Sequence, residues 1–124
     1  MPNPMPDAAR IFAQDWIAAW NARDLDAVLA HYSEDCTFVS PFVVRFAGEP
    51  SGSLTGKARL RAYWITALAA LPTLHFELVD VLEGVDCITI LYRGHRGLAA
   101  EVCELGADGR VVRGLALYAQ ATQS

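Results

Sequence analysis

The chain has 124 residues, a mass of 13.5 kDa and a formal net charge of -4. This length suits a single core of about 100–150 residues, and a content of 53% hydrophobic and 19% charged residues excludes intrinsic disorder. The mildly acidic balance lacks the basic footprint of a nucleic-acid binder, and no apolar run reaches the ~18–20 residues that would cross a bilayer.

The first seven residues, three of them proline, predict a loose tail ahead of one domain over residues 8–124. This start has no cationic stretch and no apolar run of the kind found in signal peptides. The three cysteines, Cys36, Cys87 and Cys103, are widely spaced and match neither a disulfide framework nor a zinc pattern. We therefore expect free thiols and a cytoplasmic location.

A helical pattern begins at Asp7, and its apolar residues recur on one stripe: Phe12, Trp16, Ala19 and Trp20. Residues 21–23 interrupt this pattern. Asp24 is suited to cap a second helix, because its side chain can accept a hydrogen bond from a free backbone N–H. The apolar positions of this short helix follow the i, i+3, i+4, i+7 spacing: Leu25, Val28, Leu29 and Tyr32.

The next segment, residues 36–44, is rich in β-branched and aromatic side chains and predicts a strand, with Pro41 marking an edge or a bend. Residues 49–53 predict a loop. A third helix is expected to begin at Thr55 or Gly56 and to end before Pro72. Its apolar face gives the strongest periodic pattern in the chain: Leu60, Tyr63, Trp64, Ala67, Leu68 and Leu71.

Four strands are predicted in the C-terminal half, near residues 74–83, 86–94, 98–106 and 110–120. The links between them are short, and the pair Asp108-Gly109 is a strong hairpin signal. Neighbouring strands should therefore be antiparallel, because a parallel crossover needs about a dozen residues. The order ααβαββββ predicts an α+β fold, in which an antiparallel sheet curves around three helices as a cone, or cystatin-like roll.

Several segments occur in an order that is found in a known superfamily. They are residues 16–28 (WIAAWNARDLDAV), 32–38 (YSEDCTF), 40–42 (SPF), 55–57 (TGK) and 108–111 (DGRV). Over about residues 8–120, this set resembles the nuclear transport factor 2-like superfamily, in particular its SnoaL-like polyketide cyclase and ketosteroid isomerase branch. The resemblance implies the cone fold, although one fold hosts many chemistries.

The ketosteroid isomerases hold an oxyanion-binding tyrosine, an oxyanion-binding acid and a general base in this cone. By the resemblance, Trp16 stands at the position of the tyrosine and Glu101 at that of the acid. Ser40 stands at the position of the base, and Tyr32 keeps a supporting tyrosine. The pocket aromatics align with Tyr63, Trp64 and Tyr118. Because serine is not a general base near neutral pH without an activating partner, we do not expect the steroid-isomerase mechanism. The activities of related cyclases, dehydratases and epoxide hydrolases, which use other arrangements of polar groups, are still alternatives.

Glu101 is the strongest candidate for chemistry. It shares a strand face with Ala99 and Cys103. If this face lines the cone, burial raises the pKa of the carboxyl and suits it to act as an acid or a base. In the opposite register Glu101 lies on an exposed or interface face. Asp80 shares the parity of the apolar Phe76 and is expected on a core face, where a carboxylate needs a partner or a function.

The three histidines are scattered along the chain. We expect His31 to complement the dipole at the end of the second helix and His75 to face outward. His95 lies with Arg93 and Arg96 in a turn that forms either a solvated rim or an anion-binding mouth. No metal-ligand spacing and no glycine-rich phosphate loop occur, so we expect no metal and no other cofactor.

These patterns predict a homodimer that is formed through the outer sheet face with Leu98, Ala100 and Val102, and whose cone binds a small hydrophobic molecule. The resemblance implies that this molecule is polyketide-like. The aromatic residues expected to bind it are Trp16, Trp20, Tyr32, Phe38, Tyr63, Trp64, Tyr92 and Tyr118. An enzymatic role implies a cofactor-independent isomerase, cyclase or lyase for an apolar carbonyl-type substrate, with Glu101, Ser40 and Asp80 as candidate catalytic residues. The alternative is a non-catalytic dimeric binding or assembly domain.

Overall fold

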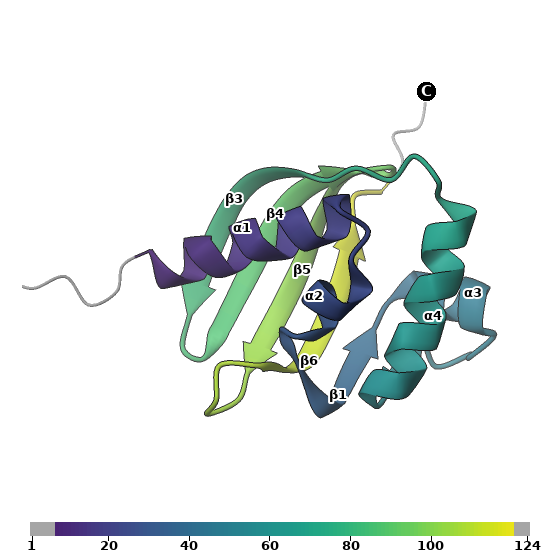
Figure 1. The fold of residues 1–124 in the computed structure, drawn as a ribbon, viewed down its shortest axis with the longest axis horizontal. Helices are drawn as coiled ribbons and strands as arrows, with labels where there is room; N and C mark the ends of the chain where they lie inside the picture. Colours follow the sequence, from purple (N-terminus) through teal and green to yellow (C-terminus); the bar gives the residue numbers. More distant parts are fainter. Residues whose placement is uncertain (1–6, 121–124) are drawn as a thin grey trace, which may run out of the picture.

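The computed structural model describes residues 7–120 and confirms an α+β fold with a curved, unclosed sheet (Figure 1). The helices are α1 (Ala8–Asn21), α2 (Leu25–Leu29), α3 (Pro41–Ala47) and α4 (Lys57–Ala70). The strands are β1 (Tyr32–Val39), β2 (Ser53–Thr55), β3 (Glu77–Gly84), β4 (Cys87–Gly94), β5 (Gly97–Leu105) and β6 (Val111–Tyr118). In Figure 1, α1, α2 and α4 lie across one face of the sheet. Of the helices described, none is long and apolar enough to cross a membrane.

The helix boundaries near the N-terminus follow the sequence closely. Asp24 caps α2, because its carboxylate accepts a hydrogen bond from the backbone N–H of Ala27 at 3.1 Å, and this confirms the predicted cap. Tyr32 departs from the prediction. It was expected as the last apolar position of the second helix, but α2 ends at Leu29 and Tyr32 begins β1.

The prediction of one strand over residues 36–44 is wrong in its second half. β1 ends at Val39, and the chain turns into α3. The Ser40 hydroxyl caps this helix by accepting a hydrogen bond from the N–H of Phe42 at 3.1 Å, and Pro41 occupies the first turn, where no N–H is needed. The short edge strand β2, which was not predicted either, then pairs antiparallel with β1. The described residues therefore contain four helices rather than three.

The strand order is β2-β1-β6-β5-β4-β3. The predicted hairpins make β3 to β6 antiparallel neighbours. The prediction of a wholly antiparallel sheet is wrong, because β1 pairs parallel with β6. The long connection from β1 through two helices and four strands gives the chain room for this parallel pairing. The pairing sets Phe38 beside Gly114, and so brings the first strand of the chain next to the last.

The end of α1 holds two other segments in place. The Asn21 amide donates a hydrogen bond to the Phe76 carbonyl at 2.9 Å, and its oxygen accepts one from the Phe76 N–H at 2.7 Å. The Arg23 guanidinium donates to the Leu68 carbonyl at 2.6 Å, near the end of α4. The chain entering β3 and the end of α4 therefore keep fixed positions relative to α1.

Candidate functional site

The strand register places small side chains next to polar ones on the concave face of the sheet. Two rows of paired residues cross β4, β5 and β6: Ile90, Glu101 and Ala116 in one, and Tyr92, Ala99 and Tyr118 in the next. One alanine stands beside Glu101 and the other stands between two tyrosines. Because interiors are otherwise close-packed, such small side chains leave open space above the sheet.

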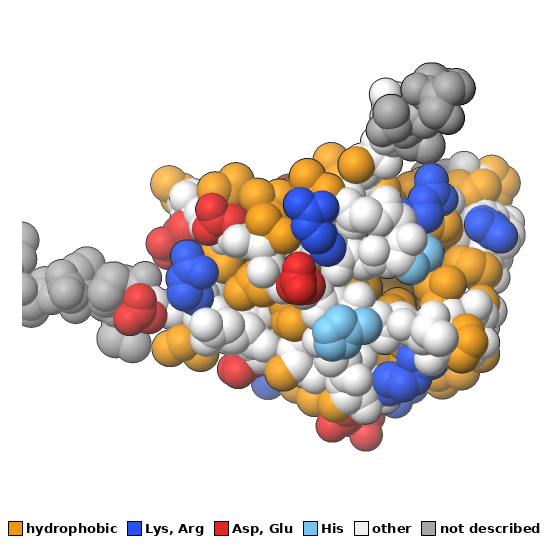
Figure 2. All heavy atoms as spheres, turned by 90° about the horizontal axis from the view of Figure 1, so that it is seen from above, with side chains coloured by type: hydrophobic (Ala, Val, Ile, Leu, Met, Phe, Trp, Pro, Cys, Tyr) orange, Lys and Arg blue, Asp and Glu red, His pale blue; other side chains and the backbone are white. Residues whose placement is uncertain are grey.

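A cavity that opens to solvent at its mouth lies over these rows. Figure 2 shows the molecule hollowed toward its right-hand end, among hydrophobic side chains. Glu101 is the one acidic residue of this lining within the described part of the chain. The aromatic lining residues are Trp16, Trp20, Phe38, Phe42, Phe46, Tyr63, Trp64, Phe76, Tyr92 and Tyr118. The space therefore suits a flat apolar molecule with few polar atoms.

A chain of two hydrogen bonds fixes the Glu101 carboxyl. The Trp16 indole N–H donates to the Tyr32 hydroxyl at 3.1 Å, and that hydroxyl donates to Glu101 Oε2 at 3.1 Å. All three residues are at most 2% exposed. Neither carboxyl oxygen accepts a hydrogen bond from a cationic side chain within residues 7–120. The carboxyl is therefore held by neutral donors in an apolar environment.

Burial raises the pKa of the Glu101 carboxyl to about 8, and the hydrogen bond from Tyr32 acts in the opposite direction without cancelling it. At neutral pH the group is therefore mostly the neutral acid, which can donate a hydrogen bond. Burial also raises the pKa of the Tyr92 phenol well above its usual value, and the nearby Glu101 adds to that effect. This phenol stays protonated throughout the physiological range.

Gly114 makes room for the carboxyl. A Cβ atom at this position would lie 3.1 Å from Glu101 Oε2 and 3.4 Å from the Phe38 ring. Even the smallest side chain would therefore press on the oxygen that Tyr32 holds. The glycine is placed on β6 opposite Cys103, so this packing follows from the β5–β6 register.

Two further polar groups border the cavity region. The Trp20 indole N–H is buried and has no hydrogen-bond partner within residues 7–120. An unpaired buried donor of this kind usually costs about 1–3 kcal/mol. Burial raises the pKa of the Tyr63 phenol to about 12 and also raises that of the Tyr118 phenol above its ordinary value, and the nearby Ser40 hydroxyl acts in the opposite direction without cancelling either effect.

The mouth of the cavity carries aromatic and basic groups. His95 and Arg96, from the turn between β4 and β5, line it together with Phe42 and Phe46 of α3. Burial, together with the positive charges of Arg96 and Arg45, lowers the pKa of the His95 imidazole. His95 is therefore neutral at physiological pH, and the arginines supply the charge of this region.

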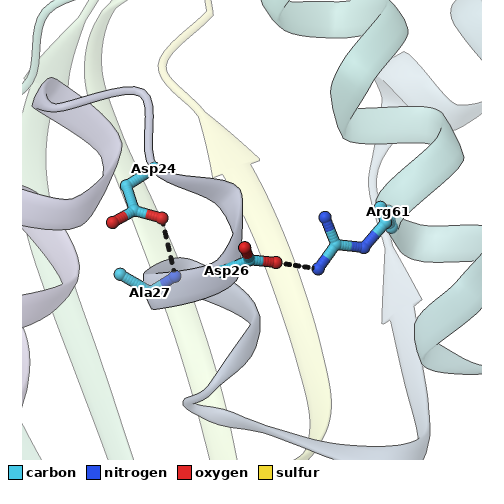
Figure 3. A network of polar contacts seen from close by, with 4 residues as sticks. All are labelled: Asp24, Asp26, Ala27 and Arg61. Carbon is cyan, nitrogen blue, oxygen red and sulfur yellow. Dashed lines mark hydrogen bonds and ion pairs between the residues drawn. The ribbon is translucent and has the colours of Figure 1, made fainter.

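Other ionic contacts lie away from the cavity. Figure 3 shows Asp26 of α2 paired with Arg61 of α4, which ties these two helices together. The prediction that Asp80 faces the core is wrong: its side chain is exposed and forms an ion pair with Arg10 at 3.6 Å. The register of β3 shifts between Leu78 and Asp80, and this irregularity reverses the face on which the following residues lie.

Most of the predicted binding residues meet in one place. The residues placed in the cavity wall are Trp16, Trp20, Phe38, Tyr63, Trp64, Tyr92, Tyr118 and the candidate acid Glu101. Tyr32 lies outside this wall and supports Glu101. Ser40 is buried at the start of α3. His75 is exposed as predicted, whereas His31 is half-buried against the Phe12 ring, which differs from a solvated helix end.

The sequence interpretation missed several wall residues. Phe42 and Phe46 were hidden because α3 was interpreted as the end of a strand. Their i, i+4 spacing after the Ser-Pro pair was the available signal. Ala99 and Ala116 were not singled out, although their pairing with large neighbours across the sheet creates the space. Within residues 7–120, there is no group of three or more His, Cys, Asp or Glu side chains that could hold a metal ion.

The comparisons with known proteins agree with this geometry. Residues 13–119 match the family model of the SnoaL-like domain. A SnoaL-like protein of unknown function from Burkholderia thailandensis shares 51% identity, and the alignment covers 95% of this chain and all of that one with a TM-score of 0.88. No functionally curated protein matches significantly.

Two more distant structures share the fold. IdmH from Streptomyces antibioticus, described as a candidate polyketide cyclase, is 16% identical over 89% of this chain and 91% of its own, with a TM-score of 0.71. TerC, which was co-crystallised with polyporic acid, is also 16% identical, over 90% of this chain and 92% of its own, with a TM-score of 0.71. At this identity the likeness shows the fold alone.

Proposed function

This chain belongs to the SnoaL-like domain family, and from that premise we propose that it binds a small apolar carbonyl compound in its cone. The observation that carries the proposal is the neutral carboxyl of Glu101 in a cavity wall that is mostly apolar and aromatic. A neutral carboxylic acid can donate a hydrogen bond to a carbonyl oxygen, and it does so most effectively where water is excluded.

The same group gives the site a route to turnover. A hydrogen bond from the neutral acid of Glu101 stabilises the enolate of a bound carbonyl compound, because negative charge develops on the oxygen that accepts it. Its ionised form can accept a proton from the carbon beside the carbonyl group. This chemistry fits a cofactor-independent isomerisation, cyclisation or elimination. The alternative is a binding domain that holds such a molecule without converting it.

One further observation supports a bound ligand. IdmH and TerC, which share the fold, are described in connection with a polyketide cyclisation and with polyporic acid respectively. These descriptions belong to those proteins, but they favour an aromatic or polyketide-like ligand here.

The binding proposal is tested with 1-tetralone and tetralin, two bicyclic molecules that differ in one carbonyl group. Calorimetric titration near pH 6 should show that the protein prefers 1-tetralone, and Glu101→Leu should reduce this preference about tenfold. Ala116→Phe should abolish binding of both, because the new ring fills the space beside Glu101. Ala107→Phe, the same change in the exposed β5–β6 turn, should leave binding intact. Equal binding to wild type and Ala116→Phe would refute the proposed cavity site.

We also propose a homodimer formed through the outer sheet face. Mostly apolar side chains continue across the strands there in two paired rows: Leu91, Ala100 and Leu117 in one, and Val102 and Leu115 with the polar Thr89 in the other. Leu98 is 40% exposed and Leu117 51%, so this face leaves apolar area uncovered in a single chain.

Sedimentation should therefore give a dimer for the wild type and a monomer for Val102→Glu, since a carboxylate in a dimer interface would be desolvated. Val85→Glu, at an exposed turn position, is the matched control and should remain dimeric. A monomeric wild type would contradict the dimer but not the cavity site.

The free thiols Cys36, Cys87 and Cys103 support the further proposal of one domain working in the cytoplasm.

A further inference from the structure

The mouth of the cavity is built from two arginines that rest on two aromatic rings. The guanidinium carbon of Arg96 lies 5.6 Å from the centre of the Phe42 ring, and that of Arg45 lies 5.3 Å from the Phe46 ring. Both rings line the cavity. Stacking of this kind limits where a guanidinium can move and leaves its N–H groups free to donate.

The charge of these two arginines is not neutralised within residues 7–120, where neither forms an ion pair. The two charges that act on His95 are both positive and come from Arg96 and Arg45. Glu49, just after α3, is already engaged by the backbone and side chain of Ser51. At the hollowed end of the face in Figure 2, blue and pale-blue side chains occur without red ones.

A second hollow adjoins the mouth. It shares Phe42, Arg96 and Tyr118 with the main cavity and adds Arg45 and Pro41 to its wall. Its volume is about 770 Å³, open solvent included. Arg96 therefore lines both hollows, and Arg45 lines the second.

We propose that the rim formed by Arg45, His95 and Arg96 binds a carboxylate of the ligand, so that the substrate class is an apolar aromatic or polyketide-like acid. This inference rests on the proposed function of the cone. It assigns two ends to one ligand: an anionic group at the rim and a carbonyl oxygen at Glu101.

The orientation of the ligand in the cavity follows from the free-energy cost of burying its charge. A carboxylate at the deep end would lose its water among apolar groups, with no cation beside it within the described residues. At the rim it stays partly hydrated and meets guanidinium groups, which match a carboxylate with paired N–H donors. The neutral His95 ring can add a further donor. The rim therefore orients an acid so that its apolar body enters first.

The test uses 2-naphthoate and 2-naphthamide, which have nearly the same shape and differ in charge. Calorimetric titration at low salt should show that wild type prefers 2-naphthoate. Arg45→Gln and Arg96→Gln should each weaken 2-naphthoate binding about fivefold to tenfold and leave 2-naphthamide binding unchanged. Added salt should reduce the ratio of the 2-naphthoate affinity to the 2-naphthamide affinity, because salt screens the attraction between the exposed arginines and the carboxylate. Arg110→Gln, in the exposed β5–β6 turn, is the matched control and should change neither affinity.

The possible outcomes distinguish failure of the proposed rim site from failure of the proposed binding site in the cone. Equal binding of both probes to wild type, or equal loss of both in the arginine variants, would overturn the rim while leaving the cone site standing. Glu101→Gln should not alter the preference for 2-naphthoate, and a loss of preference there would place the carboxylate at the deep end instead. If neither probe nor 1-tetralone binds, the proposed function fails and the rim has no ligand to orient.

Discussion

Glu101→Gln is expected to stabilise the protein increasingly as the pH rises. In the folded chain the pKa of the Glu101 carboxyl is about 8, against an ordinary value of 4.5. Between these two values the folded state binds one proton more than the unfolded state, so the stability of the wild type falls as pH increases. The contribution of the neutral acid is complete below the unfolded pKa and is lost as pH rises through the folded one. Glutamine, which does not titrate, is free of this loss.

The advantage of Glu101→Gln over wild type should grow by roughly 4 kcal/mol between about pH 5 and pH 9. Urea unfolding of both proteins across this range measures it, and the difference between them removes the contributions of other titrating groups. Glu104→Gln is the matched control, because Glu104 lies on the same strand and its side chain is partly exposed in an ion pair with Arg113. A constant difference between Glu101→Gln and wild type across the range would show that Glu101 is ionised at neutral pH.

Tyr32→Phe is expected to cost about 2–5 kcal/mol in the free energy of unfolding near pH 6. The variant keeps the ring but removes the hydroxyl that joins Trp16 to Glu101. The Trp16 N–H and Glu101 Oε2 then lose their partners in a region with almost no solvent exposure. The pKa of Glu101 should also rise further, because the Tyr32 hydrogen bond lowers it in the wild type.

Urea unfolding near pH 6 checks this loss, and Tyr118→Phe serves as its control. Tyr118 is a half-buried wall residue with no hydrogen bond to Glu101 within the described chain, so its hydroxyl should contribute about 1 kcal/mol or less. The double variant Tyr32→Phe with Glu101→Gln measures how strongly the two groups are coupled. A loss at Tyr32 no larger than that at Tyr118 would mean that the hydrogen-bond chain does not stabilise the fold.

The fold could be predicted where local signals agree with each other. Asp24 caps a helix, Pro72 follows one, and the short links from β3 to β6 leave only antiparallel hairpins. The prediction failed where two patterns compete. Residues 41–47 contain β-branched and aromatic side chains that favour a strand, but the Ser40 cap and Pro41 favour a helix, and tertiary packing of α3 against α4 and β2 decides the outcome.

The candidate site was predictable to the extent that strand alternation holds. The parity of β5 is regular, so Ala99, Glu101 and Cys103 do share the concave face. The parity of β3 is interrupted by the irregularity before Asp80, which no single residue in the sequence marks. The mouth was predictable only in part. The turn that holds His95 and Arg96 was one of the sequence-based candidates for an anion-binding mouth, whereas Arg45 comes near it only through the contact of α3 with the β4–β5 turn.

The central claim is that a buried carboxyl keeps its proton at neutral pH and presents it to a ligand in the cone. The most direct measurement is a carbon-detected NMR titration of the Glu101 side-chain carboxyl, with and without 1-tetralone. The structure predicts a midpoint near pH 8 for the free protein. It also predicts a higher midpoint with 1-tetralone bound, because a ligand that accepts the proton in a hydrogen bond favours the neutral acid. A midpoint near the ordinary value of 4.5, or one that 1-tetralone leaves unchanged, would contradict this claim.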